Sequence, residues 1–599
     1  MAFFRAVNRC KTSASFRAIA RLEDRIFPNS RRKKKKKKSS FLRLRLPPST
    51  QTMYGIQAQR ALRSFSSNAY PPLSSWATLD PKTLMAPGRP HKQYNLLNGE
   101  WRGTAAYETI VDPLGGGAML SVPFTSDSEA AAFGASMVST PKTGLHNPFR
   151  NIERYVMLGK VSGAAGAALR DPEILSYFSR LVQRTSPKSY KEAEGEVKVC
   201  AAFLENFAGD NVRFLARGFS VPGNHDGQRS NGFRFPFGGV AIITPFNFPI
   251  EIPCLQAMGA LFMGNKPLIK VDSKVSVVME EFMRLLHAVG LPKGDADLVH
   301  CDGPTFGRLI KAYEPRMTLF TGSAKVAEAL AVQQRGKVKL EDAGFDWKIL
   351  GPDVPCDPKL REYVAWQSDQ DAYACSGQKC SAQSCLFVHK NWVAAGLLDR
   401  LASLAGRRRL EDLTIGPVLT WTTAQMQAHV KALCSIPGAK LLFGGKALTG
   451  HSIPPQYGAM EATAVSVPLE EALKAAHYAT VTREVFGPVQ VVLEWSDEQL
   501  PLVLQACERM EHHLTAGVVS NDPVFTSKVM GSTVNGTQYI GWRARTTGAP
   551  QNHWFGPSGD PRGAGIGTKE AIQLVWSSHR EIIEDWGPVA SGWTLPPPS

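Results

Sequence analysis

The sequence predicts an α/β protein with two doubly wound sheets and a small additional β element. Short apolar segments alternate with helical patterns, since GVAIITP, KPLIKV, DLVHC and TLFTGS are each followed by a helix. A second series of the same kind runs from 347 to about 535. Apolar strands that alternate with helices are typical of parallel sheets covered on both faces. At 599 residues the chain is too long for one hydrophobic core, so two or three domains are expected.

The first 68 residues have the composition of a mitochondrial targeting leader, which is not part of the predicted fold. They contain 18 of the 69 Lys and Arg residues but only two acidic residues, Glu23 and Asp24. The net charge of +17 therefore belongs to this segment, and the rest of the chain is nearly neutral. The stretch RSFS at 63–66 resembles a processing site. The run RRKKKKKK could instead be a nuclear localisation signal or a simple solvated charge cluster. We expect a mitochondrial matrix protein without a nucleic-acid partner.

The folded sequence begins near Tyr70. YNLLNGEWR predicts two strands joined by a turn at Asn98 and Gly99, and residues 125–215 carry helical patterns. The alternation that starts at Phe214 predicts a hairpin. A Gly- and Pro-rich loop is expected over 536–568, followed by a helix and a final strand.

Neither a metal centre nor a membrane span is predicted. The ten cysteines form no disulfide framework, and CSGQKCSAQSC lacks the closely spaced cysteine pairs of most zinc and iron–sulfur sites. No apolar run reaches the roughly 18 residues that a transmembrane helix requires. The cysteine usage indicates a reducing compartment.

Cys380, at the centre of SGQKCSAQS, is the candidate nucleophile. Its small polar neighbours leave the thiol approachable, and CLFVH after it predicts a buried strand. We therefore expect Cys380 in a turn that enters this strand, a common place for a nucleophile in an α/β enzyme. A single cysteine is more often a small core residue, so its assignment depends on the other motifs.

Three features predict a ligand-binding edge on the first sheet. TLFTGSAKVAEAL has no G-x-G-x-x-G, but a strand passes through Gly322 and Ser323 into a helix, where free N–H groups favour a diphosphate. Lys270 ends the strand KPLIK, and Asn247 in TPFNFP follows the strand before it. The alternatives for these residues are a helix cap, a solvated charge and a turn cap.

Together these motifs resemble the aldehyde dehydrogenase superfamily. TPFNFP, PLIK, FTGS, the Glu of EDAGFDW, SGQKCSA and EVFGP occur in that family's order and spacing. The loop RARTTGAPQNHWFGPSGDPRGAGIGT is most similar to plant-type mitochondrial 1-pyrroline-5-carboxylate dehydrogenases. The resemblance implies an NAD-binding domain over 69–343, a catalytic domain over 344–568, and oligomerisation elements at 217–235 and 569–599. It also implies a homodimer or larger homo-oligomer.

The resemblance assigns roles to individual residues. Cys380 would attack the aldehyde, Asn247 and the Cys380 N–H would hold the oxyanion, and Glu341 would activate water. The implied cofactor-binding residues are Lys270, Gly322, Ser323, Glu484 and Phe486.

Two departures from the family bear on the cofactor. Ala343 stands where the family usually has a glycine, and no Glu follows Lys270 at the usual distance. Such a Glu disfavours NADP, so we expect NAD, with NADP possible.

The implied substrate is L-glutamate γ-semialdehyde, the open form of 1-pyrroline-5-carboxylate, oxidised to L-glutamate in proline catabolism. Phe248 would line the sleeve around its methylene groups, and Ser381 would face its head group. The backbone N–H groups of Gly563, Ala564 and Gly565 would wrap its carboxylate. The family's Ser in that loop is missing here, and a plain Gly-rich connection is the alternative.

Other functions remain open at this point. The nearest is an aldehyde dehydrogenase for another acidic semialdehyde, such as succinic semialdehyde. A CoA-acylating enzyme is disfavoured because Glu341 supplies a hydrolytic base. From a different class, the chain could be a catalytically silent scaffold of the same fold, against which the intact Cys380, Asn247, Lys270 and Glu341 argue.

Overall fold

The computed structural model describes residues 70–85, 89–342, 344–548, 553–589 and 591–599. Residues 68–599 form one compact unit, which is the part of the chain treated below. The predicted leader with its processing site, and Ala343, lie outside the described residues. Among the described helices, none has the length and apolarity needed to cross a bilayer.

The first α/β part is built on a seven-stranded sheet with the order β12–β11–β8–β9–β10–β2–β3. The strands from β12 to β10 are parallel, whereas β2 and β3 run antiparallel at one edge. These strands are β2 Asn95–Leu97, β3 Glu100–Arg102, β8 Gly239–Ile243, β9 Lys266–Lys270, β10 Asp297–Leu298, β11 Thr318–Thr321 and β12 Val338–Glu341. The strand–turn–strand predicted around Asn98 is confirmed as β2 and β3.

The second α/β part contains another seven-stranded sheet, in the order β15–β16–β17–β14–β13–β18–β19. All its neighbours are parallel except β15 at the edge. Its strands are β13 Asp346–Leu350, β14 Gln383–His389, β15 Lys440–Phe443, β16 Thr463–Ser466, β17 Val489–Trp495, β18 Thr515–Val519 and β19 Thr537–Ile540. The predicted domain boundary at 343 lies between β12 and β13, and the division itself stays a proposal.

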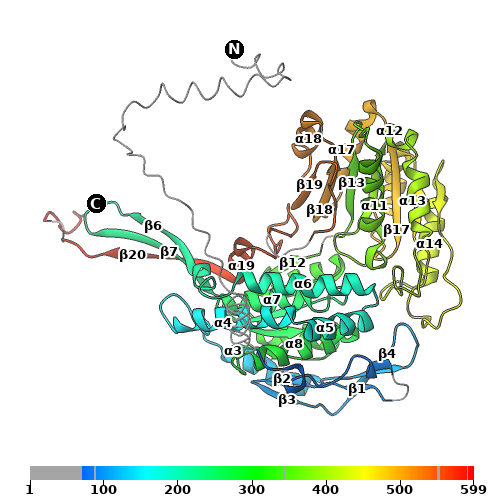
Figure 1. Ribbon diagram of the computed structural model, residues 1–599. Coiled ribbons are helices and arrows are strands. Elements are labelled where there is room, and N and C mark those ends of the chain that lie inside the picture. The colour runs from blue at the N-terminus through cyan, green and yellow to red at the C-terminus, as the bar shows by residue number, and fades with distance from the viewer. Residues whose placement is uncertain (1–69, 86–88, 343, 549–552, 590) are drawn as a thin grey trace, which may run out of the picture. The chain divides into compact units, whose positions relative to one another are not determined.

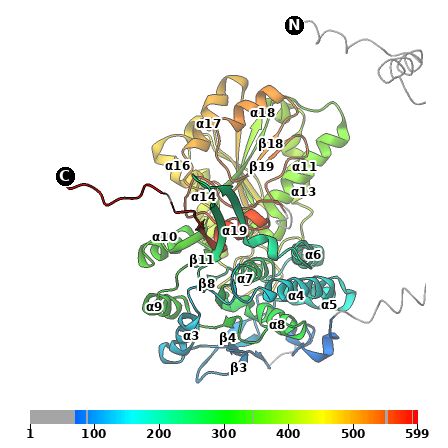
Figure 2. The ribbon, with the colours of Figure 1, turned by 90° about the vertical axis from the view of Figure 1, so that its left-hand side faces the viewer.

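Helices cover both sheets, as the two views in Figures 1 and 2 show. Those of the first part are α3 Asp127–Ser139, α4 Glu153–Arg170, α5 Pro172–Thr185, α6 Tyr190–Asn206, α7 Glu251–Phe262, α8 Ser276–Ala288, α9 Gly303–Tyr313 and α10 Ala324–Gln333. Those of the second are α11 Pro358–Tyr373, α12 Lys390–Ala394, α13 Leu397–Ala405, α14 Thr423–Cys434, α15 Leu469–Ala472, α16 Ala475–Val481, α17 Leu500–Glu508 and α18 Pro523–Met530. Polar residues begin several of them: Ser126 and Ser189 form capping boxes before α3 and α6, as this residue type favours.

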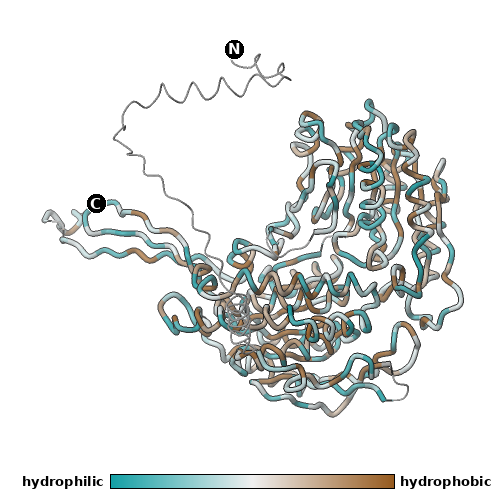
Figure 3. The backbone as a smooth tube through the Cα atoms, in the orientation of Figure 1, coloured by the Kyte–Doolittle hydropathy of each residue, from teal (hydrophilic) through white to brown (hydrophobic). Residues whose placement is uncertain are grey.

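The central helix α7 lies in the hydrophobic core of the first part. Every residue of EIPCLQAMGALF is buried, although a surface helix would have a polar face. It packs within one large apolar cluster that includes Leu255, Met258 and Phe282. Figure 3 shows apolar stretches gathered around α7 and α8. A separate cluster around Trp347 and Phe387 forms the core of the second sheet.

A three-stranded antiparallel sheet projects from the first part (Figure 1). It consists of β6 Arg217–Pro222, β7 Gln228–Pro236 and β20 Ser577–Asp585, the last entered from α19 Lys569–Trp576. The predicted hairpin and C-terminal strand are therefore confirmed, and β7 pairs with β20 along its length. Strand β6 is exposed throughout and includes Phe219 and Val221. Its role in oligomerisation stays a prediction.

Two details differ from the predicted elements. The loop expected over 536–568 contains an ordered strand, β19, which extends the second sheet by parallel pairing with β18. A further sheet, β1–β5–β4, was not predicted because its strands alternate weakly. Its strands are β1 His91–Lys92, β4 Tyr107–Val111 and β5 Ala118–Pro123.

Candidate active site

The carboxyl ends of four neighbouring parallel strands carry predicted site residues. Glu341 ends β12, Gly322 and Ser323 follow β11, Asn247 lies after β8, and Lys270 ends β9. From β8 the sheet is extended on one side by β9 and β10, and on the other by β11 and β12. The order in which the strands are added to the sheet thus reverses next to β8. A reversal of this kind opens a crevice outside the strand ends, where ligands of open α/β sheets bind. The sheet topology therefore brings these motifs to one edge.

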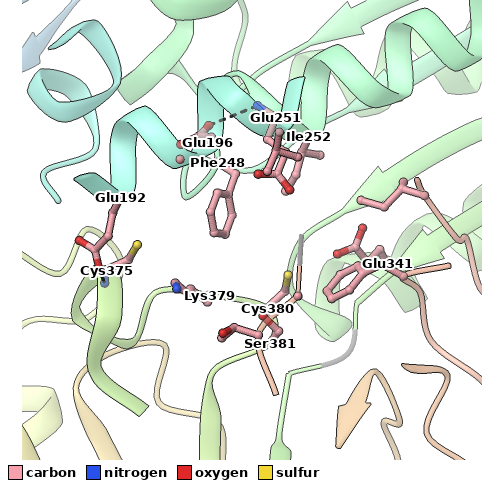
Figure 4. A pocket seen from close by; sticks show the side chains of 16 residues that line it. Glu192, Glu196, Phe248, Glu251, Ile252, Glu341, Cys375, Lys379, Cys380 and Ser381 are labelled. Carbon is pink, nitrogen blue, oxygen red and sulfur yellow. Dashed lines mark hydrogen bonds between the residues drawn. The ribbon is translucent and has the colours of Figure 1, made fainter. Parts of the chain in front are cut away.

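A pocket of about 370 Å³ joins this edge to the second part of the chain. Figure 4 shows Cys380 and Ser381 on one side of it and Phe248 and Glu251 on the other, with Glu341 beside the thiol. The lining residues are Glu192, Gly195, Glu196, Val199, Phe248, Glu251, Ile252, Glu341, Cys375, Lys379, Cys380, Ser381, Thr547, Gly548, Phe555 and Ile566. The candidate nucleophile and the candidate base thus face one cavity.

The backbone just before Cys380 is held in an unusual conformation. Cys375, Ser376 and Gly377 have φ angles of 54°, 57° and 70°, so three successive residues are left-handed. Each non-glycine residue in this region costs roughly 1–2 kcal/mol. Gly377 is required for space as well, because a Cβ there would lie 2.1 Å from the Gly487 carbonyl oxygen. The nucleophile loop, defined here as residues 374–382, therefore needs support from its surroundings.

Hydrogen bonds from several elements provide this support. Glu192 on α6 belongs to the first α/β part, so its carboxylate ties the nucleophile loop to the opposite wall of the pocket. Glu192 Oε1 accepts from the N–H of Cys375 at 2.9 Å, Ser376 Oγ accepts from the N–H of Gly416 at 2.7 Å, and Gln378 Nε2 donates to the Pro417 carbonyl at 3.0 Å. These bonds fix the position from which Cys380 enters β14.

The Glu341 carboxylate lies in a dry environment. Only 2 % of Glu341 is exposed, and neither of its oxygens has a hydrogen bond of ordinary geometry with a described residue. The pKa of Glu341 is raised to about 7, mainly by burial; the adjacent Cys380 thiol partly offsets this rise, and Asp342 contributes to it. A carboxyl group with this pKa can gain and lose a proton near neutrality, as a general base must.

The Cys380 thiol is partly exposed to the pocket. Burial raises the pKa of Cys380 well above its usual value, and the carboxyl groups of Glu341 and Asp346 raise it further. The thiol is therefore neutral at physiological pH in this structure. The nucleophilic thiolate requires either a proton acceptor or a positive charge brought by a ligand.

A buried ion pair fixes the segment that carries Asn247. Lys188 Nζ lies 3.1 Å from Glu196 Oε2 and donates to the Asn247 carbonyl at 2.6 Å. Glu196 Oε1 accepts from the N–H groups of Ile250 and Glu251 at 2.9 and 3.2 Å. Asn247 is 3 % exposed, and its side-chain oxygen has no partner among the described residues. Lys188 and Glu196 thus hold the backbone on both sides of Phe248.

The predicted cofactor residues fit a dinucleotide. Within the described part of the chain, the side chains of Lys270, Ser323 and Glu484 form no hydrogen bond or ion pair with another residue. The Ser323 side chain accepts no bond from the first turn of α10, and the Val326 N–H donates to the Ser323 carbonyl at 3.0 Å. The two N–H groups before Val326 therefore remain available to a diphosphate. Gly322 donates its N–H to the Glu341 carbonyl at 3.2 Å. This bond connects the turn between β11 and α10 to the end of β12, which carries Glu341.

Glu484 and Phe486 approach this region from the second part. The Glu484 carboxylate lies against Gly344, where a Cβ would come within 2.1 Å of it. Burial raises the pKa of Glu484 to about 8. The Phe486 ring packs edge-on against Phe246, with ring centroids 5.9 Å apart. A residue with a side chain at position 344 of the EDAG motif would therefore clash with Glu484, so glycine is required there.

Two of the three N–H groups that were expected to anchor the substrate carboxylate are bonded within the protein, and the anchor stays a prediction. The N–H of Gly563 donates to the Asp560 carbonyl at 2.9 Å, and that of Ala564 donates to the Leu340 carbonyl at 2.8 Å. Gly565 packs under the Trp554 ring. This stretch is a backbone connection alongside β12, and the C-terminal residues that line the pocket are Thr547, Gly548, Phe555 and Ile566. Phe248 and Ser381 do line the pocket, as expected.

Several residues of the site were missed in the sequence. Lys188, Glu192, Glu196 and Glu251 resemble ordinary helix or loop charges, and only the packing of α6 against α7 brings them together. The capping pattern Ser189-x-x-Glu192 was visible, but it predicts a helix start and no contact with Cys375. No local pattern could have identified these residues.

Replacing Lys188 should impair catalysis through Asn247. Lys188→Met removes the bond to the Asn247 carbonyl and leaves Glu196 buried without its cation, which costs about 3–5 kcal/mol of stability. A displaced oxyanion donor should lower kcat by about 10- to 100-fold, below the ~10²–10³ for complete removal. Equilibrium unfolding measures the loss of stability, and steady-state kinetics of the folded enzyme measures the change in kcat.

Lys198→Met is the matched control, because Lys198 lies on α6 in an exposed pair with Glu194. Its effect on stability should be at most about 1 kcal/mol. Unchanged kcat in Lys188→Met would show that the ion pair has no role in placing Asn247.

Comparisons with known proteins agree with this site. A family model described as the aldehyde dehydrogenase family matches residues 167–571. The chain is 61 % identical over 522 residues to a probable aldehyde dehydrogenase of Linum usitatissimum, covering 87 % of this chain and 94 % of that protein. It is 57 % identical over 559 residues to the mitochondrial delta-1-pyrroline-5-carboxylate dehydrogenase 12A1 of Arabidopsis thaliana, covering 91 % of this chain and 100 % of that protein.

The fold agrees with a solved structure as well. Betaine aldehyde dehydrogenase from Staphylococcus aureus in complex with NAD+ superposes with a TM-score of 0.72 at 18 % identity, covering 86 % of this chain and 99 % of that chain. The resemblance seen in the motifs is confirmed by these matches. The chain belongs to the aldehyde dehydrogenase family.

Proposed function

We propose that this enzyme oxidises L-glutamate γ-semialdehyde, the open form of 1-pyrroline-5-carboxylate, to L-glutamate in the mitochondrial matrix, as a step of proline catabolism. The observation that carries the proposal is the 57 % identity over the whole length of a relative named as a mitochondrial delta-1-pyrroline-5-carboxylate dehydrogenase. The shared pocket of Cys380 and Glu341 supports it chemically.

The reaction begins at Cys380. Its thiol gives a proton to the ionised carboxylate of the adjacent Glu341, which passes the proton to solvent. The sulfur then forms a bond to the aldehyde carbon, which places negative charge on the aldehyde oxygen. Donors for this oxygen are the Asn247 amide and the backbone N–H of Cys380. Lys188 and Glu196 hold Asn247 in place for this role.

NAD is the cofactor of the proposal, with NADP possible. Lys270, Gly322, Ser323, Glu484 and Phe486 are the residues that would hold it. When bound, its nicotinamide supplies the acceptor for the hydride that leaves the substrate carbon. Asp272, close after Lys270, pairs with Lys274 at 3.1 Å and is therefore already neutralised, so no unpaired acid excludes a 2′-phosphate here.

Glu341 completes the cycle. Loss of the hydride leaves the acyl group on the Cys380 sulfur as a thioester. Glu341 takes a proton from water, the resulting hydroxyl attacks the thioester carbon, and the carbon–sulfur bond breaks to release the acid. The thiol is then regenerated at Cys380.

The assembly is part of the proposal. The projecting sheet of β6, β7 and β20 has an exposed edge strand, which can pair with a second copy of the chain. A homodimer or a larger homo-oligomer would cover its exposed apolar residues.

The proposed activity is tested with the purified chain, a panel of semialdehydes, and NAD or NADP. We expect the highest kcat/KM with L-glutamate γ-semialdehyde and NAD, and an undetectable rate for Cys380→Ser. Succinic semialdehyde as the best substrate would favour the other acidic-semialdehyde activity, and an inactive wild-type enzyme would indicate a silent scaffold.

The pH dependence follows from Glu341. Its folded-state pKa of about 7 means that the base is protonated and inactive below that pH and becomes active above it. The deacylation rate should therefore rise with pH through about 7, as measured by single-turnover kinetics. Because Asp342 raises this pKa, Asp342→Asn should move the rise to lower pH.

Asp353→Asn, at a residue outside the pocket lining, serves as the control and should leave the profile in place. A profile that is the same in Asp342→Asn and the wild type would contradict the assignment of the rise to Glu341.

A further inference from the structure

Four carboxyl side chains line the pocket: Glu192, Glu196, Glu251 and Glu341. Two of them are engaged by the protein itself. Glu192 accepts from the N–H and Oγ of Ser189 at 2.9 and 2.8 Å, and from the N–H of Cys375. Glu196 is paired with Lys188 and accepts the two backbone bonds described above. Glu341 lies beside the Cys380 thiol, where the chemistry needs a base.

Glu251 remains without such a function. It is the first residue of α7, and only 9 % of it is exposed. No described residue makes a hydrogen bond or an ion pair within 4 Å to its carboxylate. Figure 4 shows it on the α7 side of the cavity, between Phe248 and Glu341. Its side chain is therefore a buried, unpaired carboxylate that faces the pocket.

A structural role at the start of α7 does not explain Glu251. An acidic residue in a first turn can stabilise the helix through its free N–H groups. Here the N–H groups of Ile250 and Glu251 are already satisfied by Glu196. The carboxylate of Glu251 is thus not needed as a cap.

The electrostatics of Glu251 agree with a site for a cation. Burial is the main reason that the pKa of Glu251 is raised to about 8; Glu196 contributes to the rise, and Lys188 and Lys379 partly offset it. Without a ligand the group is therefore largely protonated near neutral pH, and a bound cation would favour its ionised form. Lys379 belongs to the nucleophile loop across the cavity and forms no ion pair with Glu251. A buried carboxylate without a partner is costly, so a ligand that brings a positive charge would relieve this cost.

We propose that Glu251 binds the α-ammonium group of the substrate and so selects an amino-acid semialdehyde over its deaminated analogue. This inference rests on the proposed function, whose substrate carries an ammonium group three carbon–carbon bonds from the aldehyde carbon. Glutarate semialdehyde has the same chain and carboxylate but no ammonium group. Glu251 is then a specificity-determining residue, and the pair of aldehydes isolates the one contact it makes.

The test compares both aldehydes in the wild-type enzyme and in Glu251→Gln, which keeps the size of the side chain and removes its charge. A hydrogen bond to a charged group is worth about 1.5–3 kcal/mol. We therefore expect kcat/KM for L-glutamate γ-semialdehyde to fall about 10- to 100-fold, while that for glutarate semialdehyde stays the same or rises. Calorimetry should show the same selectivity for the products, with weaker binding of L-glutamate and unchanged binding of glutarate.

Glu192→Gln is the matched control, because this carboxylate supports the nucleophile loop and should affect both aldehydes alike. An equal loss on both aldehydes in Glu251→Gln would overturn the inference, as would unchanged kinetics. If the wild-type enzyme oxidises neither aldehyde, the proposed function fails. Product binding still decides the role of Glu251 in that case, since equal affinities of the variant and the wild type for L-glutamate would contradict it.

Discussion

The chemistry of this site depends on keeping a thiol and a buried carboxyl group together at one pocket. Burial is the largest influence on the pKa of both Cys380 and Glu341. Glu341 also raises the pKa of Cys380, whereas the Cys380 thiol lowers the pKa of Glu341. The same low polarity that keeps the thiol neutral brings the carboxyl group to a pKa of about 7. One environment thus protects the nucleophile from reaction in the resting enzyme and prepares the base for hydrolysis.

The rest of the structure serves to hold these two groups in position. Glu341 comes from a parallel strand end of the first sheet, whereas Cys380 enters the second sheet through a left-handed stretch of backbone. Glu192 connects the two walls, and the Lys188–Glu196 pair fixes the segment of Asn247. Buried ion pairs contribute little net stability compared with apolar contacts, so their value here lies in defining one geometry.

Much of the fold and part of the site could be predicted from the sequence. The motifs at Asn247, Lys270 and Gly322 each lie at the end of a predicted apolar strand, and parallel strands end at the same edge of a sheet, whereas Glu341 was identified only through the family resemblance. Their convergence therefore follows from the pattern itself. The strand after Cys380 was equally clear from CLFVH.

The remaining features depend on tertiary packing and left no local signal. Cys375 and Ser376 are left-handed without being glycine, and Glu192 and Glu251 become pocket residues only when α6 and α7 pack together. The Gly-rich stretch at Gly563 suggested free backbone donors, but the N–H of Gly563 donates to the Asp560 carbonyl and that of Ala564 donates to Leu340 of β12. Glycine indicates conformational freedom and does not show whether an N–H group is available.

The central claim is that Cys380 carries the acyl group and Glu341 releases it. The most direct measurement mixes Glu341→Gln rapidly with NAD and L-glutamate γ-semialdehyde at alkaline pH, where more of the thiol is ionised. The account predicts one equivalent of NADH per active site, then very slow turnover, and an acyl adduct on the peptide that contains Cys380. Sustained turnover at the wild-type rate, or an adduct on a different cysteine, would contradict it.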